Sequence, residues 1–260
     1  ASVSLIFNPT LVSLPVAVCG DKENRHGIVL AKNEIAKGFG VKTAEPIFEA
    51  KRKCPELVIL PPLMDKYLEY SQKAREIYAR YTDMIEPFGL DECWLDVTGS
   101  RLLFGAPEKI ADEIRKRVKF ELGITVSVGV SWNKIFAKLG SDYKKPDAVT
   151  VINKDNYKKI VYPLPVSDLL MVGPATTRKL KNHGIYTIGE LADAPPEMLA
   201  AFLGKMGYVL HSFSNGYENA PVGVSGSTPL IKSVGNGITA PRDLMNEEDI
   251  KSVQYVLAES

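Results

Sequence analysis

The chain has 260 residues, of which 45% are hydrophobic and 24% charged, with a formal net charge of +1. Its length exceeds the usual domain size of about 100–150 residues, so two or three compact units are expected. It contains no apolar run of about 18 residues and no signal-peptide pattern, which argues against a membrane or secreted protein. The three widely spaced cysteines predict reduced, packed thiols rather than disulfides or a zinc site.

The first 84 residues predict a small unit followed by a long helix. Residues 1–62 have the pattern of helices and strands and end at Pro61-Pro62. Residues 63–84 predict a helix, because apolar and tyrosine side chains recur at helical spacing. This stripe consists of Leu63, Tyr67, Tyr70, Ala74, Ile77, Tyr78 and Tyr81. We interpret its tyrosines as core residues rather than as a platform for stacking bases.

Three carboxylates, Asp91, Glu92 and Asp96, lie within a short strand-like segment, residues 89–99. An ionised carboxylate without a partner is costly to bury, so such a group attracts a proton, a basic side chain or a metal. Oxygen ligands of this kind suit Mg²⁺. Alternatively, Asp91 and Glu92 lie in a surface hairpin and Asp96 caps a turn. The segment alone leaves both interpretations open.

A helix is predicted at 106–121, and its buried stripe consists of Ile110, Ala111, Ile114 and Val118. The basic run 115–119 is therefore interpreted as a solvated helix face. Alternating apolar residues predict a strand at 124–130. Five basic residues crowd around the helix predicted within 131–147, and a closing strand is expected near 148–152. Lysines beside an acidic cluster indicate a phosphate ligand.

The last third of the chain is predicted to be mainly helical. Residues 168–180 have the pattern of two helical stretches joined by a tight Gly173-Pro174 turn, typical of a helix-hairpin-helix. Residues 220–229 are rich in proline, glycine and serine and predict a linker. A strand at 232–239 and a helix from about Asn246 are expected after it.

In order and spacing, these segments resemble the Y-family, translesion DNA polymerases of the bacterial DNA polymerase IV type (ImpB/MucB/SamB-like). The resemblance covers nearly all 260 residues. The matching segments are Ala1-Ser2-Val3 with Asn8-Pro9, Pro15-Val16-Ala17-Val18, Gly40-Val41-Lys42-Thr43, Glu86-Pro87-Phe88 with the acidic run, Asn133-Lys134-Ile135-Phe136-Ala137-Lys138, and Lys144-Lys145-Pro146.

The resemblance implies an α+β, right-hand polymerase with a ferredoxin-like palm, for which we expect an antiparallel sheet with helices on one face. It implies low-fidelity, template-directed DNA synthesis past damaged bases. The expected parts are fingers at 1–62, palm at 63–152, a thumb with the helix-hairpin-helix at 153–219, a linker at 220–229, and the start of a little finger at 230–260.

The chain departs from the family at its beginning and in the fingers. In the family, the first metal-binding Asp and an aromatic steric gate lie on a palm strand that runs into the Ala-Ser-Val segment. We therefore expect a truncated form that lacks this strand and is inactive alone. Ser4 stands where the family usually has Glu, and the Tyr-Glu-Ala-Arg motif of the fingers appears as Glu34-Ile35-Ala36-Lys37.

The resemblance implies a two-metal catalytic site with two Mg²⁺ ions, or Mn²⁺ in their place. Asp91 is expected to bridge both ions, and Glu92 to hold the catalytic ion. Both side chains reach one metal pair only if the strand bends, which Gly89 permits. Lys37 and Lys145 are expected to bind the triphosphate of the incoming nucleotide. Asp96 is interpreted as a structural carboxylate.

The thumb is expected to bind a DNA phosphate through backbone N–H groups of its turn and the adjacent helix N-terminus. The predicted DNA-binding residues are Val172, Gly173, Ala175, Thr176, Thr177, Arg178 and Lys179. Pro174 removes one N–H donor from this turn. Because the net charge is only +1, local clusters of basic residues must supply the attraction for DNA.

The implied partners are primer–template DNA, a dNTP, and a sliding clamp that would bind through a segment beyond Ser260. The implied location is the bacterial cytoplasm, at the nucleoid, without a membrane. A non-catalytic DNA-binding or scaffold relative is the main alternative. A nucleotide cyclase also uses paired acids on a ferredoxin-like fold, but it has no need for a helix-hairpin-helix.

Overall fold

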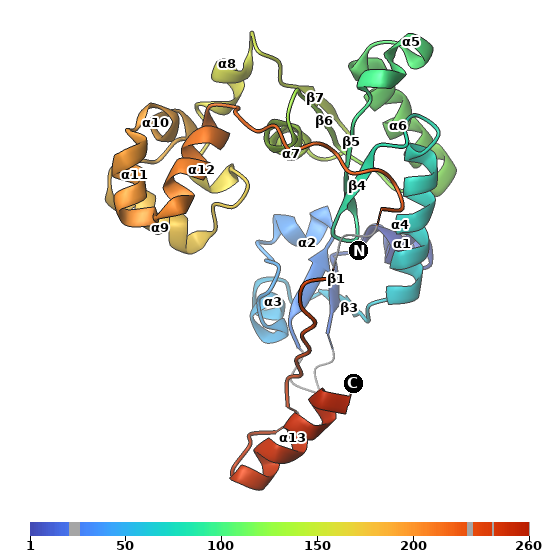
Figure 1. Ribbon diagram of the computed structural model, residues 1–260. Helices are drawn as coiled ribbons and strands as arrows, with labels where there is room; N and C mark the ends of the chain where they lie inside the picture. Colours follow the sequence, from blue (N-terminus) through green and yellow to red (C-terminus); the bar gives the residue numbers. More distant parts are fainter. Residues whose placement is uncertain (21–26, 228–230, 241, 260) are drawn as a thin grey trace. The chain divides into compact units, whose positions relative to one another are not determined.

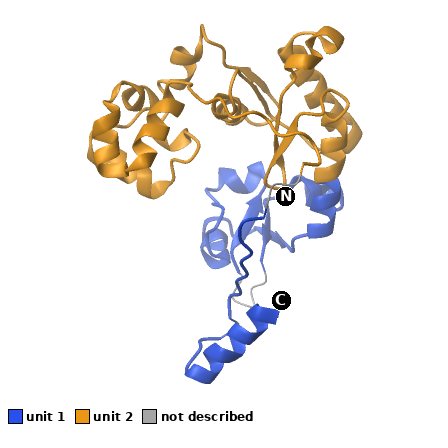
Figure 2. Cartoon of the chain, in the orientation of Figure 1, with its two compact units in different colours: residues 1–70, 228–260 blue, residues 71–227 orange. Residues whose placement is uncertain are grey.

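The computed structural model describes residues 1–20, 27–227, 231–240 and 242–259. These residues form two compact units, 1–70 with 228–260 and 71–227 (Figure 2). Residues 228 and 229 of the predicted linker, and 230, 241 and 260 of the predicted little finger, lie outside the described residues. None of the helices in the described part of the chain is long and apolar enough to span a bilayer.

The first unit contains a three-stranded sheet in the order β2-β1-β3 (Figure 1). The central strand β1 is antiparallel to β2 and parallel to β3. All four residues of β1 are buried, as its apolar sequence and central place require. The elements are α1 (Ser2–Ile6), η1 (Pro9–Leu11), β1 (Val16–Cys19), β2 (Val29–Lys32), α2 (Glu34–Gly38), α3 (Ile47–Lys53) and β3 (Val58–Leu60).

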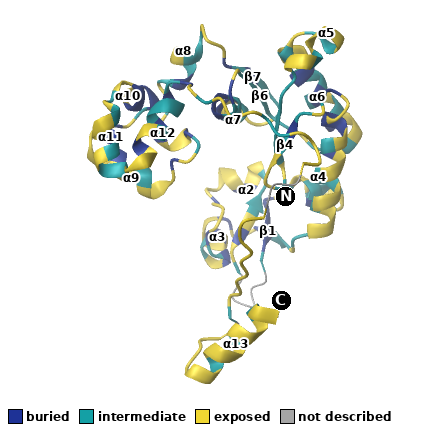
Figure 3. Ribbon diagram, in the orientation of Figure 1, coloured by how far each residue is buried: buried dark blue, intermediate teal, exposed yellow. Residues whose placement is uncertain are grey.

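The C-terminal residues of the first unit form one helix, α13 (Glu247–Glu259), close to the expected start at Asn246. Helix α13 has no buried residue in the described structure (Figure 3). The predicted strand at 232–239 is wrong, because the described residues 231–240 form no strand. A β-strand needs an adjacent strand whose backbone groups pair with its own N–H and C=O groups. Here the apolar side chains are uncovered, with Val234 92% exposed.

The second unit begins within α4 (Met64–Tyr78) and contains two pairs of strands and most of the helices. Its palm-like part consists of β4 (Ile85–Phe88), β5 (Glu92–Leu95), η2 (Thr98–Ser100), α5 (Arg101–Phe104), α6 (Pro107–Leu122), β6 (Val128–Val130), α7 (Lys134–Tyr143) and β7 (Val149–Val151). The following part consists of α8 (Tyr157–Val161), η3 (Val166–Asp168), α9 (Pro174–Asn182), α10 (Ile188–Asp193), α11 (Pro196–Leu203) and α12 (Lys205–Ser214).

Helix α4 ends at Tyr78, before the predicted end at 84. After the helix, Thr82 links the two segments that flank the strand pair: its hydroxyl accepts from the Met84 N–H at 3.1 Å and donates to the Asp96 carbonyl at 2.7 Å. The apolar side of α4 and Tyr81 lie in a core with α6. The buried residues of this core are Ala74, Ile77, Tyr78, Tyr81, Ile85, Ile110, Ile114 and Val118. The interpretation of the tyrosines as core residues is therefore confirmed for Tyr78 and Tyr81, whereas Tyr67 and Tyr70 are only partly buried and lie outside this core.

Strands β6 and β7 pair in parallel, so the expectation of an entirely antiparallel palm sheet is wrong for this pair. Helix α7 connects them and returns the chain to the end of the sheet where β6 began, which makes the second strand parallel to the first. The strands β4 and β5 form an antiparallel hairpin, as expected. Strand β6 starts at Val128, later than the predicted 124.

The helices after β7 share a core with the buried side of α7. Its largest fully buried side chains include Phe136 of α7 and Leu180, Leu199 and Leu210 of the later helices. The helical stretch predicted before Gly173 is wrong, because this part contains only the single 3₁₀ turn η3. Helix α9 after the turn is confirmed, with Pro174 at its first position, where the missing N–H has no intrahelical role.

Gly129 lets α7 pack tightly on β6. A Cβ at this position would lie 1.8 Å from the Ala137 carbonyl oxygen and 2.5 Å from the Ser141 nitrogen, and both are backbone atoms. Gly140 of the facing helix is also constrained, since a Cβ there would lie 3.2 Å from the Gly129 Cα. The two facing glycines thus allow this helix and strand to approach so closely.

We expect Gly129→Ala to lower the free energy of unfolding by about 1–3 kcal/mol or more, because the added methyl group must displace the α7 backbone. Urea denaturation monitored by circular dichroism measures this change. Gly99→Ala is the matched control, since nothing lies within 4 Å of a Cβ at that position. An unchanged midpoint for Gly129→Ala would show that α7 is not held by this contact.

Candidate functional site

The two acidic residues predicted to bind metal lie at the tip of the β4–β5 hairpin. Asp91 is exposed in the turn, and Glu92 is the first residue of β5. Gly89 has φ of +76°, so the chain bends where the sequence indicated. The hairpin interpretation of the acidic run is thus correct in its geometry, and it leaves both carboxylates at one end of the strand pair. The Asp96 carboxylate accepts from the Thr98 N–H at 2.8 Å, which confirms its structural role.

Hydrogen bonds from two neighbouring helices hold the hairpin. The Ser71 hydroxyl of α4 donates to the Leu90 carbonyl in the turn, and Arg75 donates to the Ser71 hydroxyl at 2.8 Å. On the other side, the Trp94 indole N–H donates to the Lys134 carbonyl at 3.0 Å. The acidic tip is therefore presented by a strand pair that both helices support.

A chain of ion pairs connects Glu92 to Lys145. Lys138 Nζ lies 2.9 Å from Glu92 Oε1 and 2.8 Å from Asp142 Oδ2, and Lys145 Nζ lies 2.6 Å from Asp142 Oδ1. Burial alone would raise the pKa of Asp142, but the two ammonium groups lower it below its ordinary value. The structure thus brings one predicted metal ligand and one predicted phosphate ligand into a single charged cluster.

Lys138 and Asp142 were not among the predicted site residues. With Lys134 they stand four residues apart along α7, so they share one face of the helix. The opposite face, with Phe136 and Leu139, is buried. Helical spacing within the basic segment was the signal that could have identified this polar face.

The basic run at 115–119, interpreted as a solvated face, differs in part from that expectation. Arg115 has a side chain only 18% exposed and lies 2.6 Å from Asp147, beyond α7. Lys119 lies at the same distance from the other carboxylate oxygen of Asp147. Lys116 and Arg117 do form exposed pairs within their own helix. Sequence periodicity could not reveal the partner, because Asp147 is distant along the chain.

Lys37 belongs to the first compact unit, whereas Lys145 and the acidic hairpin belong to the second. It lies on α2, where Asn33 caps the helix by accepting from the Ala36 N–H at 3.0 Å. Its side chain is 59% exposed and forms a surface pair with Glu34 at 3.1 Å. Such a pair contributes little to stability, so the ammonium group can exchange its partner at low cost.

The predicted DNA-binding turn lies at the N-terminus of α9 beside a hollow of about 610 Å³. Gly173 is the N-cap and makes no side-chain cap. The first N–H groups of an α-helix have no intrahelical acceptors, so those of Ala175 and Thr176 are suited to an anion. The hollow is lined by Ser167, Val172, Pro174, Thr177, Arg178, Lys181 and Asn182. Of these lining residues, Ser167, Pro174, Lys181 and Asn182 were not among the predicted DNA-binding residues. The predicted Gly173, Ala175, Thr176 and Lys179 do not line the hollow.

The segment after α12 is bound to the palm-like part by charged groups. Lys134 Nζ lies 2.6 Å from Glu86 Oε2 and donates to the Pro221 carbonyl at 2.8 Å. The same Glu86 oxygen accepts from the Gly223 N–H at 2.8 Å. We call these four residues the connector clamp. The predicted linker is thus tied down over its described part rather than loose.

Comparison with known proteins shows to which family this chain belongs. Residues 1–142 match the model of the impB/mucB/samB family. The chain belongs to this family. The matched region includes the acidic hairpin and the polar face of α7, with Lys138 and Asp142.

Curated relatives of the family match the whole chain. It is 56% identical over 260 residues to a DNA polymerase IV of Acetivibrio thermocellus and 41% identical to DNA polymerase IV 1 of Bacillus subtilis. Both matches cover 100% of this chain, which spans 65% and 62% of the relatives' lengths. These matches therefore include Lys145 and the α9 turn, which lie outside the region matched by the family model.

The fold is that of the Y-family polymerases. The structure of DinB from Sulfolobus solfataricus superposes with a TM-score of 0.77 at 27% identity, over 85% of this chain and 65% of the other. The insertion ternary complex of Dbh DNA polymerase gives a TM-score of 0.77 at 26% identity, with the same coverage. The predicted α+β fold with a ferredoxin-like palm is confirmed. The boundaries of fingers, palm, thumb and little finger remain predictions.

We expect Glu86→Gln to weaken the connector clamp by about 1–2 kcal/mol at pH 7, because the ion pair with Lys134 is lost. Burial raises the pKa of Glu86, but Lys134 and the Gly223 N–H outweigh this effect and lower it. The stabilisation is therefore present above the unfolded pKa of about 4.3 and is lost as the pH falls through the lower, folded value.

Urea denaturation of wild type and Glu86→Gln from pH 7 to pH 3 measures this difference. The two free energies of unfolding should converge toward the acid end. The exposed Glu108→Gln serves as a control that removes a carboxylate from α6. A difference that is constant with pH would show that Glu86 contributes through packing alone.

Proposed function

We propose that the full-length gene product containing this chain is a translesion DNA polymerase. In this proposal it binds primer–template DNA and a dNTP, and it transfers the nucleotide to the primer 3′ end, also opposite damaged bases. Family membership supports this function, since the matched relatives carry the name DNA polymerase IV. A neighbouring structure is named as an insertion ternary complex of a DNA polymerase.

The ion-pair chain from Glu92 to Lys145 carries the proposal. Nucleotidyl transfer requires carboxylates that hold cations and cationic side chains that hold a triphosphate, placed side by side. Glu92 and Lys145 are joined through only two residues, Lys138 and Asp142.

The described residues contain no group of three or more metal-ligating side chains, so a divalent cation here would rely on two carboxylates and on phosphate oxygens of the substrate, as Mg²⁺ commonly does. Asp91 and Glu92 are adjacent carboxylates at an exposed tip, and Glu92 already pairs with the ammonium group of Lys138. We propose that both bind Mg²⁺, or Mn²⁺ in its place. When bound, such ions neutralise negative charge on the reacting phosphates and the attacking oxygen. Lys138 keeps the Glu92 carboxylate at the site and balances its charge.

Lys145 and Lys37 are proposed to bind the triphosphate of the incoming nucleotide. Lys145 is 51% exposed and can turn from Asp142 to a phosphate oxygen. Lys37 has only a surface partner to leave. A lysine acts here as a point charge, without the two-pronged geometry of an arginine.

The α9 turn is proposed to bind the DNA backbone. The cations Arg178 and Lys181 line one hollow beside the first turn of α9, and cations and helix N–H groups recognise phosphates without reading bases. Lys179 lies on the same helix and is exposed. A polymerase must slide along any sequence, which such contacts permit.

The first test of this function removes the charge of each acid. Asp91→Asn and Glu92→Gln in the full-length protein should reduce primer extension by at least about a hundredfold while duplex affinity stays within about twofold. Single-turnover extension and fluorescence anisotropy of labelled duplex measure the two quantities. Glu108→Gln is the matched control and should extend normally. Extension at the wild-type rate in either hairpin variant would contradict the assignment.

A second test separates nucleotide binding from DNA binding. Lys37→Ala and Lys145→Ala should raise the KM for dNTP or lower kcat/KM by about 1–3 kcal/mol of transition-state stabilisation, because each loses a charge-assisted bond to an anion. Arg178→Ala and Lys179→Ala should instead weaken duplex binding. They should also make the slope of the logarithm of the binding constant against the logarithm of the salt concentration shallower by up to about one unit.

Titration of dNTP in single-turnover extension and of salt in duplex binding, on all four variants, checks this division. If Lys37→Ala and Lys145→Ala lose duplex affinity as the α9 variants do, with dNTP dependence unchanged, both lysines belong to a DNA-binding surface. A non-catalytic scaffold would show no dNTP-dependent step in any variant.

A further inference from the structure

A second cluster of charges lies on the loop that carries Lys145. This loop joins the end of α7 at Tyr143 to the start of β7 at Val149. Asp147, two residues after Lys145, has a left-handed φ of +55° and a side chain only 19% exposed. A non-glycine residue keeps such a backbone conformation only where its surroundings hold it.

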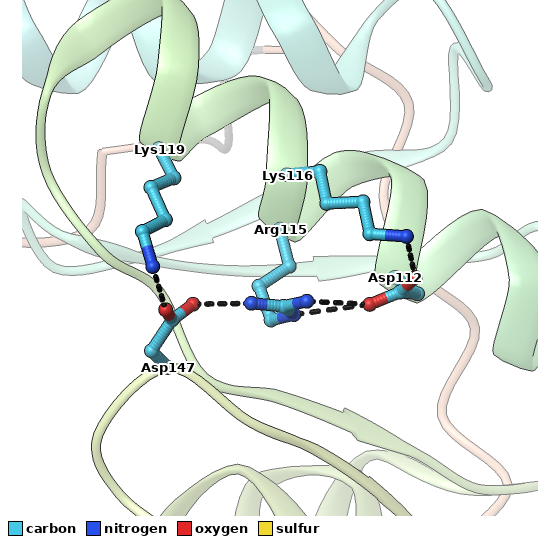
Figure 4. Close-up of polar contacts among 5 residues, drawn as sticks. All are labelled: Asp112, Arg115, Lys116, Lys119 and Asp147. Carbon is cyan, nitrogen blue, oxygen red and sulfur yellow. Dashed lines mark hydrogen bonds and ion pairs between the residues drawn. The ribbon is translucent and has the colours of Figure 1, made fainter.

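Both carboxylate oxygens of Asp147 are bound by α6 (Figure 4). Arg115 Nη1 donates to Oδ1 at 2.6 Å, and Lys119 Nζ donates to Oδ2 at 2.6 Å. The hydrogen bonds from Lys119 and Arg115 lower the pKa of Asp147. The carboxylate therefore remains charged and bound over the whole neutral range.

Arg115 is itself oriented from the other side. Its Nε and Nη2 donate to Asp112 Oδ1 at 3.1 and 2.8 Å, and Lys116 Nζ lies 2.7 Å from the second oxygen of Asp112. The guanidinium group is thus held between two carboxylates in a fixed plane, which suits arginine better than lysine (Figure 4).

Helix α6 is a rigid support for this contact. Its opposite face contributes Ile110, Ala111, Ile114 and Val118 to the core, each at most 5% exposed. The polar face with Arg115 therefore cannot move without disturbing buried side chains. A group on such a helix positions a loop more accurately than the loop could position itself.

We propose that Arg115 and Lys119, acting through Asp147, position Lys145 for the triphosphate of the incoming nucleotide. They are positioning residues, since their own charges are engaged by Asp147 and Asp112. This inference rests on the proposed function, because it assigns Arg115 a role only if Lys145 binds phosphate. It differs from the interpretation of the basic run as a solvated helix face.

The test is a set of substitutions in the full-length protein. Arg115→Gln and Asp147→Asn should each raise the KM for dNTP about threefold to tenfold, with a smaller change in kcat and duplex affinity within about twofold. Arg117→Gln, two residues further along α6 and paired with Glu121, is the matched control and should leave the KM unchanged.

The deciding measurement repeats Arg115→Gln in a Lys145→Ala background. If Arg115 acts by positioning Lys145, the second substitution adds no further rise in KM, whereas independent effects multiply. Two results would overturn the positioning role and leave the proposed function intact. One is that the effects of the two substitutions on KM multiply. The other is that KM is unchanged in both Arg115→Gln and Asp147→Asn while Lys145→Ala is impaired. An unchanged KM in Lys145→Ala overturns the phosphate-binding role itself.

Thermal melting of each variant keeps a folding defect separate from the kinetic effect. Should Arg115→Gln be unfolded at the assay temperature, Arg115→Lys replaces it. Lysine keeps the charge but cannot bind both carboxylates in one plane, so the proposal expects an intermediate KM. The proposal would be refuted if folded Arg115→Lys and Asp147→Asn both had the wild-type KM for dNTP.

Discussion

The close contact between β6 and α7 determines where the charged groups of the second unit lie. There is no room for a side chain between Gly129 and the α7 backbone, so the main-chain atoms of the helix and the strand are in direct contact. One face of α7 is buried by this contact and by the core. Its other face must then direct Lys134, Lys138 and Asp142 toward the hairpin, the connector and the Lys145 loop.

Paired charges make this polar face stable. Lys134 and Lys138 are only 12% and 19% exposed, and a lysine so deeply placed is tolerated because carboxylates surround it. Two of these carboxylates also serve a second partner: Glu86 binds the connector, and Asp142 binds Lys145. The site is therefore close to neutral before any ligand arrives. This explains how a chain of net charge +1 can present anion-binding groups.

The phosphate sites that we propose in the palm-like part and at the α9 turn differ in their chemistry. In the former, side-chain charges are interlinked and fixed by α4, α6 and α7, which suits the exact placement of one small ligand. At the α9 turn, the exposed cations Arg178 and Lys181 line a hollow on the surface, which suits a polymer that moves past it. Pro174 costs one donor there but starts the helix in the required conformation.

Sequence alone determined the local features. The acidic run, the bend at Gly89, the buried stripe of α6 and the start of α9 follow from residue types and short-range spacing, which are sufficient for turns and amphipathic helices. The parallel pairing of β6 and β7 was not predicted, because strand direction depends on the path of α7 through space. The partners of Arg115, Lys138 and Gly223 were likewise decided by tertiary structure, since each contact joins residues that packing, and not spacing, brings together.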